Sequence, residues 1–375
     1  MFDYELIKKI KEWKTDDSLP LCIGCDVGIS RIKVRLSDFN NPSRYIDVGL
    51  VKADTTSQLI SVLQDLQEQI LHVDSKAVCL GSAIAVAGPI KNNSVILTNW
   101  NGSVEDRSIS ISQLPSGIFP KGRSYFLNDL EACAYGIIGA NEQGILEENF
   151  AQLFEERAPI GPILSSDRTA VLAMGSGFGV ALIVRTPLLD TPLVIPTEIG
   201  HIQIPPRMEK HKLFEEEDDL LEYISKCNYQ GRLDPEYEDI CSARGIKICY
   251  QYYHLKSTGE KINLDKIDPA DIALRAIRGD RDAHDALKTH YLYFFRAAKA
   301  IASSLSCQSI VLALDNQVKN YPFVISIVEE LEDEFYEFIR PEWICGTRIY
   351  SQKSLINFTV LGTIYMAHTI ANKPE

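Results

Sequence analysis

The sequence of 375 residues contains no hydrophobic run long enough to cross a membrane as a helix, which takes about 20 apolar residues. Its longest nearly uncharged stretch, 78–90, has 13 residues and includes Gly81, Gly88 and Pro89. The N-terminal segment MFDYELIKKIKEWK is charged and amphipathic and lacks the apolar core of a signal peptide. We therefore expect a cytoplasmic protein that does not bind membranes.

The sequence is also short of positive charge, because 38 Lys and Arg stand against 51 Asp and Glu and leave a net charge of −13. Proteins that bind nucleic acids or anionic membranes neutralise phosphate with basic surfaces, so neither partner is expected here. Any polyanionic ligand has to be held by local groups. At roughly 150 residues per domain the length predicts about two domains, and 45% hydrophobic residues suffice for a core in each.

The nine cysteines lack the pattern of a disulfide framework, since their number is odd and most stand among apolar neighbours. Cys22 and Cys25 form a CxxC, but the segment around them reads as a strand, which places their Cα atoms about 10 Å apart on opposite faces. A disulfide requires less than roughly 7 Å. No second CxxC completes a zinc site, so reduced, buried thiols are expected.

Two strand–turn–strand patterns begin near residues 21 and 169. A predicted strand over 21–27 meets a turn at Gly28 and returns through the alternating segment SRIKVRLSD, and a strand over 169–174 meets the glycine turn 175–179 and returns over 180–184. This weak duplication predicts an α/β fold with two lobes facing each other across a cleft. Further strands are predicted over 47–52, 78–86, 124–127 and 309–314, and helices over 55–73, from 129, over 271–305 with a break at Gly279-Asp280, over 323–339 and over 355–370.

Both turns have small residues at the bend, where backbone N–H groups are open to a phosphate. Either turn alone is also compatible with a plain hairpin. Asp26 ends the first strand just before Gly28, where a carboxylate can hold hydrated Mg²⁺ against phosphates, although a turn-capping role is the simpler alternative. The pair of turns therefore predicts a phosphate clamp.

Polar residues at other strand ends suit a polyol. Asn128 and Asp129 lie at a strand-to-helix junction, the edge where α/β proteins bind ligands, although they also fit a helix N-cap. The segment Glu198-Ile199-Gly200-His201 can bring a carboxylate and an imidazole to one ligand, and Glu238 precedes Cys241-Ser242-Ala243-Arg244-Gly245. Their carboxylates and amides predict hydrogen bonds to sugar hydroxyls beside the phosphate clamp.

In this order the motifs are recognisable: from about Pro20 to the C-terminal helix, the chain resembles the bacterial-type glucokinases and their protist relatives, within the hexokinase, actin and Hsp70 ATPase group. Five segments carry the resemblance. Asp26-Val27-Gly28-Ile29-Ser30 matches the family's first phosphate motif, Leu127-Asn128-Asp129-Leu130-Glu131-Ala132 matches the segment with the catalytic aspartate, and Gly175-Ser176-Gly177-Phe178-Gly179 matches the second phosphate motif. Glu198-Ile199-Gly200-His201 is similar to the family's Glu-Gly-Gly-His, and Tyr237-Glu238 ahead of Ser242 and Gly245 is similar to the family's Tyr-Glu ahead of Ser-Gly-x-Gly.

The resemblance implies a two-lobed actin-like ATPase (ribonuclease H-like) fold. Its expected parts are an N-terminal helix over 1–19, a small α/β domain over 20–128 on which the C-terminal helix 355–375 packs back, and a large α/β domain over 129–354. The implied enzyme is a homodimeric, ATP-dependent and Mg²⁺-dependent glucokinase that transfers the γ-phosphoryl group of ATP to the 6-hydroxyl of glucose and feeds glycolysis.

The resemblance also assigns the site. Asp129 is the expected general base. The expected sugar contacts are Asn99, Asn128, Asp129, Glu198, His201 and Glu238. The expected nucleotide contacts are Asp26, Gly28, Ser30, Gly175, Ser176, Gly177, Gly179 and Gly245, with Asp26 also holding Mg²⁺ through water.

The nucleotide side departs from the family pattern. Ile29 replaces the second glycine of the first turn, where a β-branched residue resists positive φ. Ala243-Arg244 replaces a Gly-x pair, and Leu314-Asp315-Asn316 replaces a Gly-Gly or Gly-Asp element, whereas Ser30 and Ser176 replace threonine and keep the hydroxyl. Three alternatives follow: a sugar-binding regulator with weak or no kinase activity, a kinase for another hexose, and an enzyme that uses another phosphoryl donor.

Overall fold

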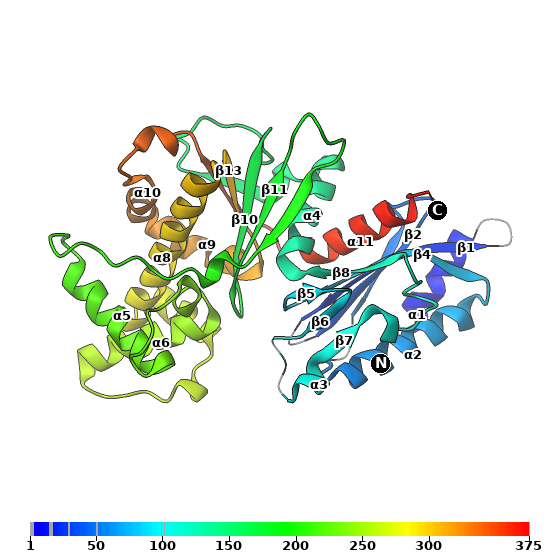
Figure 1. The fold of residues 1–375 in the computed structure, drawn as a ribbon, viewed down its shortest axis with the longest axis horizontal. Coiled ribbons are helices and arrows are strands. Elements are labelled where there is room, and N and C mark those ends of the chain that lie inside the picture. Colours follow the sequence, from blue (N-terminus) through cyan, green and yellow to red (C-terminus); the bar gives the residue numbers. More distant parts are fainter. Residues whose placement is uncertain are drawn as a thin grey trace. The chain divides into compact units, whose positions relative to one another are not determined.

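The computed structural model describes residues 4–14, 18–28, 31–49, 52–98, 100 and 102–374. The chain forms two compact α/β units, unit 1 with Met1–Leu146 and Asn357–Glu375, and unit 2 with Glu147–Ile356 (Figure 1). Among the described residues no helix is both long and apolar enough to span a membrane.

Unit 1 is built on a five-stranded sheet. Its strands in spatial order are β3 (Tyr45–Gly49), β2 (Ile32–Asp38), β1 (Leu19–Val27), β4 (Ala77–Val86) and β8 (Ser124–Asn128). β2 runs antiparallel to both β1 and β3, whereas β1, β4 and β8 are parallel. The carboxyl ends of three neighbouring strands therefore meet at one edge of the sheet.

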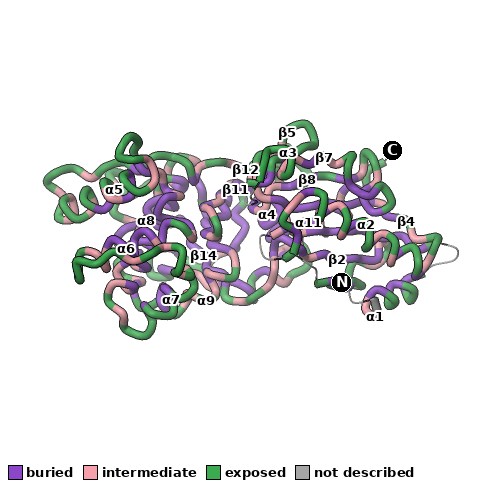
Figure 2. Tube along the Cα trace, turned by 90° about the horizontal axis from the view of Figure 1, so that it is seen from below, coloured by how far each residue is buried: buried purple, intermediate pink, exposed green. Residues whose placement is uncertain are grey.

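Helices cover both faces of this sheet, and the alternation of side chains along β1 decides which helix packs where. Leu21, Ile23 and Cys25 join the core with α2 (Thr56–Val73), whose apolar stripe is buried while its outer face is exposed (Figure 2). Gly24, on the opposite face of β1, leaves room for the backbone of α11 (Phe358–Ala371), because a Cβ there would lie 2.7 Å from the nitrogen of Ile364.

The remaining elements of unit 1 are short except for α4. They are α1 (Tyr4–Ile7), η1 (Lys8–Trp13), a small sheet of β5 (Ile90–Lys91), β6 (Ser94–Ile96) and β7 (Ser108–Ser110), α3 (Val104–Arg107), η2 (Ile111–Gln113) and α4 (Asp129–Glu142).

The helices α4 and α11 pack backbone to backbone through glycines. A Cβ on Gly136 would lie 1.9 Å from the carbonyl oxygen of Phe358, and a Cβ on Gly362 would lie 1.6 Å from that of Ala132. Through this contact α4 lies within unit 1, so the units divide after Leu146, whereas the expected small domain ends at residue 128.

Unit 2 has a six-stranded sheet. Its strands in spatial order are β12 (Leu193–Thr197), β11 (Phe178–Val184), β10 (Arg168–Met174), β13 (Ser309–Leu312), β14 (Arg348–Gln352) and β9 (Phe150–Leu153). The other elements are η3 (Glu147–Asn149), η4 (Ile199–His201), α5 (Phe214–Tyr229), η5 (Tyr237–Asp239), α6 (Ala243–Thr258), η6 (Leu264–Lys266), α7 (Pro269–Ile277), α8 (Arg281–Leu305), α9 (Asp315–Ser326), α10 (Val328–Tyr336) and η7 (Pro341–Trp343).

The predicted duplication is confirmed by strand order and direction. The order β12-β11-β10-β13-β14 matches β3-β2-β1-β4-β8, with two antiparallel strand pairs followed by two parallel pairs in both units. The break near Gly279 is also confirmed, since it separates α7 from α8. In the aromatic segment of α8, Tyr291, Tyr293, Phe294 and Phe295 are buried in the core.

The nine cysteines are free thiols, including Cys22 and Cys25. Seven are buried, as expected of reduced structural thiols, and burial raises the pKa of Cys22 to about 12. Cys227 and Cys345 are exposed.

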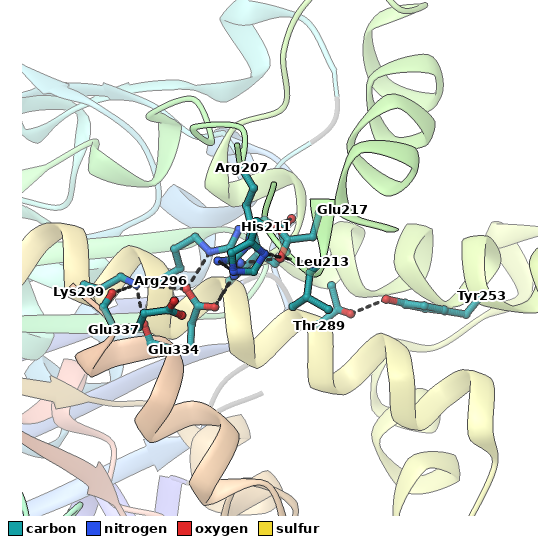
Figure 3. A network of polar contacts seen from close by, with 11 residues as sticks. Arg207, His211, Leu213, Glu217, Tyr253, Thr289, Arg296, Lys299, Glu334 and Glu337 are labelled. Atoms are coloured by element: carbon teal, nitrogen blue, oxygen red, sulfur yellow. Dashed lines mark hydrogen bonds and ion pairs between the residues drawn. The ribbon is translucent and has the colours of Figure 1, made fainter. Parts of the chain in front are cut away.

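One member of the acidic run 215–219 lies inside unit 2. The sequence favours a solvated helix start for this run, but Glu217 forms ion pairs of 2.8 Å with both Arg207 and Arg296 (Figure 3). Glu334 from α10 is the second carboxylate of this network, 2.9 Å from Arg296. One residue of the run, Glu217, therefore faces α8 and α10, where an unpaired charge would lower the stability of the fold.

Candidate active site

The carboxyl edge of the parallel strands in unit 1 gathers the first group of predicted residues. Val27 of β1 aligns with Val86 of β4, which aligns with Asn128 of β8. Asp26 therefore lies one residue before this row, and Asp129 lies one residue after it. The neighbouring parallel strands bring these two segments, about 100 residues apart in the sequence, to one edge.

Asp26 is held from two sides. Its Oδ2 accepts a hydrogen bond of 3.1 Å from Asn357 Nδ2 at the start of α11, and Lys33 Nζ lies 3.8 Å from the same oxygen. The adjacent turn is closed by a hydrogen bond of 3.2 Å from Gly28 N–H to the carbonyl of Arg31. Ile29 and the predicted nucleotide contact Ser30 lie outside the described residues.

The environment of Asp26 fits a hydrated Mg²⁺ better than a dehydrated ion. In the described part of the chain no group of three or more His, Cys, Asp and Glu side chains is arranged to hold a metal. A single carboxylate suits an ion that keeps several waters and takes most of its other ligands from substrate phosphates.

Asn128 is the N-cap of α4, which is the helix-capping role that the sequence offered as an alternative to ligand binding. Its Oδ1 accepts a hydrogen bond of 3.0 Å from Leu130 N–H, and its own N–H donates to Glu131 Oε2 at 3.2 Å. Asp129 is the first residue of α4 and is half-buried, with Oδ1 accepting a hydrogen bond of 2.9 Å from the same Leu130 N–H. The cap thus fixes the backbone from which the Asp129 side chain projects.

The thiol of Cys133, one turn along α4 from Asp129, is buried. Burial raises its pKa well above the ordinary value, and the negative charges of Asp129 and Asp26 raise it further. The remaining predicted residue of unit 1, Asn99, lies outside the described residues.

In unit 2 the second predicted phosphate turn joins β10 to β11. Gly175 N–H donates to Gly177 carbonyl at 2.8 Å across the turn, and Ser176 is exposed at its tip. A Cβ at position 177 would lie 2.6 Å from Glu238 Oε2, so a larger residue there would displace this carboxylate. The same oxygen accepts a hydrogen bond of 2.9 Å from Phe178 N–H, so a predicted sugar ligand is bonded directly to the predicted phosphate turn.

The start of α6 packs against the same turn. Ala243 N–H donates to the carbonyl of Gly175 at 2.9 Å, and Ser242 caps the helix by accepting Gly245 N–H at 3.1 Å. A Cβ on Gly245 would lie 2.5 Å from the carbonyl oxygen of Ile240, so the structure explains this glycine by close packing. The partial positive charge of a helix N-terminus beside the turn favours a bound anion.

The sugar-side residues of unit 2 form one cluster. His201 Nε2 lies 3.9 Å from Glu198 Oε2 and 4.0 Å from Glu238 Oε2. A third carboxylate in this cluster, that of Glu236, was not predicted from the sequence; its Oε1 is 2.8 Å from His201 Nδ1. In the sequence, Glu236 is distinguished only by lying three residues before Asp239, which is the spacing of a capping box at a helix start. This spacing alone does not predict a contact with His201.

The carboxylates set the protonation of His201. Partial burial works to lower the pKa of the imidazole, but the hydrogen bond to Glu236 and the negative charges of Glu236, Glu238 and Glu198 outweigh it and raise the pKa above its ordinary value. The cluster therefore offers several acceptors and, with the imidazole protonated, a donor within one small region, which suits hydroxyl groups.

Leu314 follows β13 with a backbone conformation that favours glycine. Its φ is 85° and its ψ is 162°, a region that residues with a Cβ occupy only under strain. Its Cδ1 lies 3.8 Å from the place where a Cβ on Gly175 would stand. Its N–H donates to Gln352 Oε1 at 2.9 Å, and Asn316 Nδ2 donates to the carbonyl of Met174.

The sequence of the chain is similar to glucokinases. A model of the glucokinase family matches residues 23–311, which is more than half of the chain. The chain is 62% identical to Glucokinase 1 of Trichomonas vaginalis over 375 residues and 60% identical to Probable glucokinase 2 of that organism over 377 residues, with 100% of each chain covered.

Solved structures share the fold. The crystal structure of glucokinase from Balamuthia mandrillaris in complex with glucose matches with a TM-score of 0.90 at 29% identity, covering 98% of this chain and 100% of that one. The crystal structure of Leishmania braziliensis glucokinase matches with a TM-score of 0.76 at 22% identity over 97% of both chains. The predicted actin-like ATPase fold is thus confirmed, and the chain belongs to the glucokinase family.

Proposed function

We propose that this member of the glucokinase family is an ATP-dependent glucokinase, which transfers the γ-phosphoryl group of ATP to the 6-hydroxyl of glucose. One observation carries the proposal: Glu238 joins the carboxylate and imidazole cluster to the glycine turn through its 2.9 Å hydrogen bond with Phe178 N–H. A polyol site and a phosphate site linked by one side chain are what phosphoryl transfer to a sugar requires.

In this proposal Asp129 is the general base for the acceptor hydroxyl. Its backbone is fixed at the start of α4 by the Asn128 cap, so the carboxylate has a defined approach to the proton. Glu198, His201 and Glu238 bind sugar hydroxyls, as do Asn128 and Asn99. Catalysis would come mostly from positioning and from stabilisation of the charge that develops on the transferred group.

The phosphates are proposed to lie on the two turns. Gly28 and Ser30 in unit 1, and the segment 175–179 with Gly245 in unit 2, would present backbone N–H groups and hydroxyls to them. Asp26 would hold Mg²⁺ through water, and the ion would neutralise phosphate charge when bound. Lys33, 3.8 Å from Asp26, adds a positive charge at the same edge.

We further propose that the protein works in the cytoplasm as a homodimer and that its product enters glycolysis. These points are supported by the family resemblance, and sedimentation of the purified chain tests the dimer.

A second candidate function is favoured by Leu314, whose side chain occupies the neighbourhood of the second phosphate turn. It is a sugar-binding regulator with weak or no kinase activity, or a kinase that uses a different phosphoryl donor. A coupled assay of ADP formation with glucose and Mg-ATP distinguishes the two. Activity no greater than that of Asp129→Asn, together with measurable glucose binding, would refute the kinase proposal, and turnover with polyphosphate in place of ATP would identify another donor.

A further inference from the structure

Glu236 is the residue in the sugar-side cluster that no family motif assigns. It directly precedes the Tyr237-Glu238 pair, and its carboxylate contacts the His201 ring at Nδ1, whereas Glu198 and Glu238 lie nearest Nε2. Its Oε1 accepts a hydrogen bond of 2.8 Å from His201 Nδ1, whereas the distances from Nε2 to Glu198 and Glu238 are 3.9 Å and 4.0 Å. Among the three carboxylates, it alone binds the ring at hydrogen-bond distance.

The backbone at Glu236 is held in place before any ligand arrives. Its carbonyl accepts a hydrogen bond of 3.0 Å from Asp239 N–H, and its own N–H donates to Asp239 Oδ2 at 3.0 Å. Asp239 is fully buried and is fixed in turn by Asn228, Tyr229 and Arg244 at 2.7, 2.7 and 2.8 Å. The backbone from which the Glu236 side chain projects therefore depends on a buried network rather than on the ligand.

Backbone pairing places Glu236 next to the histidine motif. Tyr237 N–H donates to the carbonyl of Ile202 at 3.1 Å, and Ile204 N–H donates to that of Pro235 at 2.9 Å. The segment after His201 thus runs antiparallel to the segment that carries Glu236, with Gln203 and Glu236 as bridge partners. The contact is consequently part of the fold of unit 2.

We propose that Glu236 is a positioning residue for sugar binding, which holds His201 by Nδ1–H so that Nε2 addresses a sugar hydroxyl shared with Glu198 and Glu238. This inference rests on the proposed function of the cluster. Gaps of about 4 Å from Nε2 to the carboxylates are too long for direct hydrogen bonds. A hydroxyl both donates and accepts, so it can bond to the imidazole and to a carboxylate together.

The charge of His201 then controls affinity. When the ring is protonated, Nε2–H donates to the sugar oxygen, and the sugar O–H donates to Glu198 or Glu238. When it is neutral with its proton on Nδ1, Nε2 presents only a lone pair beside those two carboxylates, and a donor is lost. The KM for glucose is therefore expected to rise as the pH increases through the pKa of His201, which Glu236 raises.

The test is the pH profile of the glucose KM in Glu236→Gln, from about pH 5.5 to 8.5. Glutamine keeps the size and an acceptor oxygen for His201 Nδ1–H but removes the charge, so the rise in KM should move to lower pH. At neutral pH the KM should be about tenfold higher, as expected for the loss of one charge-assisted interaction, with kcat within about twofold of wild type. Glu236→Asp, which restores the charge, should shift the profile back toward wild type.

Glu222→Gln is the matched control, because Glu222 is a surface residue of α5 paired only with Lys226 in an exposed i,i+4 contact, and its profile should equal that of wild type. An unchanged KM profile in Glu236→Gln, or a fall in kcat with an unchanged KM, would overturn the inference. A lower urea midpoint in Glu236→Gln that Glu236→Asp does not restore, with an unshifted profile, would show a purely structural role.

Glucose affinity measured by calorimetry at the same pH values separates this inference from the proposed function. If the wild type binds glucose without phosphorylating it, the proposed activity fails, and the pH shift in affinity still tests Glu236. If the wild type is active and the variant affinities coincide, only the Glu236 inference fails.

Discussion

Replacing Gly362 by alanine tests the contact between α4 and α11, which supports the helix that begins with Asp129. A Cβ at this position would lie 1.6 Å from the carbonyl oxygen of Ala132 and 2.6 Å from the nitrogen of Gly136. Real Cβ atoms essentially never approach other heavy atoms within 3.0 Å, so the two helices must separate by about 1.4 Å at this point. Both clashing atoms belong to backbone, which cannot rotate out of the way.

The cost follows from that displacement. Overpacking of a core costs about 1–3 kcal/mol, and movement of helix backbone belongs at the upper end of that range. The better helix propensity of alanine stabilises the variant by about 1 kcal/mol. We expect Gly362→Ala to lower the free energy of unfolding by about 2 kcal/mol. Because a misplacement of about 1 Å can reduce catalysis by about 100-fold, kcat should also fall by about tenfold or more.

Urea unfolding followed by circular dichroism, together with kcat for glucose, measures both effects. Gly49→Ala is the matched control: in β3, a Cβ on Gly49 meets nothing within 4 Å, so its stability and kcat should stay near those of wild type. If Gly362→Ala unfolds at the urea concentration of the wild type, the close approach of α4 and α11 is wrong, and so is the reasoning that links it to Asp129.

Further substitutions have defined outcomes. Asp129→Asn should lower kcat by about 100-fold to 10,000-fold and change the glucose KM little, as steady-state kinetics will show. Arg296→Met should lower the free energy of unfolding by about 3 kcal/mol, because it leaves the buried Glu334 and the half-buried Glu217 with fewer cations. Burial works to raise the pKa values of the Glu217 and Glu334 carboxyls, but Arg296 lowers both below their ordinary range. The stabilisation from these ion pairs should therefore be present above about pH 4.3 and be lost as the pH falls through the lowered pKa values. A Glu334→Gln variant whose stability depends on acid pH as that of wild type does would contradict this prediction. Leu314→Gly should be at least as stable as Leu314→Ala, since both lose the side chain and only glycine relieves the backbone strain of about 1–3 kcal/mol; greater stability of the alanine variant in urea would contradict the assigned conformation.

Most long elements were predictable, because burial on one face leaves a periodic pattern in the sequence. The helix over 55–73 and the strand over 78–86 match α2 and β4 closely, since each has one buried stripe or a continuous apolar run. Short strands such as β9 and β14 have four or five residues and no distinctive period, so they were missed. Their position is decided by pairing with each other and with β13, which no local pattern encodes.

Local sequence patterns also explain which polar residues could be predicted and which could not. Asp129 and the turn 175–179 were found because they directly follow strands, where a local motif marks a functional edge. Glu236 and Glu217 were not, because each takes its role from a partner distant in the sequence: His201 is 35 residues from Glu236, and Arg296 is 79 residues from Glu217. A carboxylate's own neighbours in the chain do not reveal whether it faces solvent or an arginine.

Leu314 shows what sequence and structure establish only together. The resemblance to the family implies a Gly-Gly or Gly-Asp element where this sequence has Leu314-Asp315-Asn316, and the backbone at Leu314 has a conformation suited to glycine. The strain of this conformation lies beside the turn at Gly175, since Leu314 Cδ1 is 3.8 Å from the place where a Cβ on Gly175 would stand. The carbonyl of Gly175 in the same turn accepts a hydrogen bond of 2.9 Å from Ala243 N–H. The KM for ATP in Leu314→Gly measures that side chain directly: a decrease would mean that leucine narrows the donor site, and an increase would mean that it forms part of the surface that binds the nucleotide.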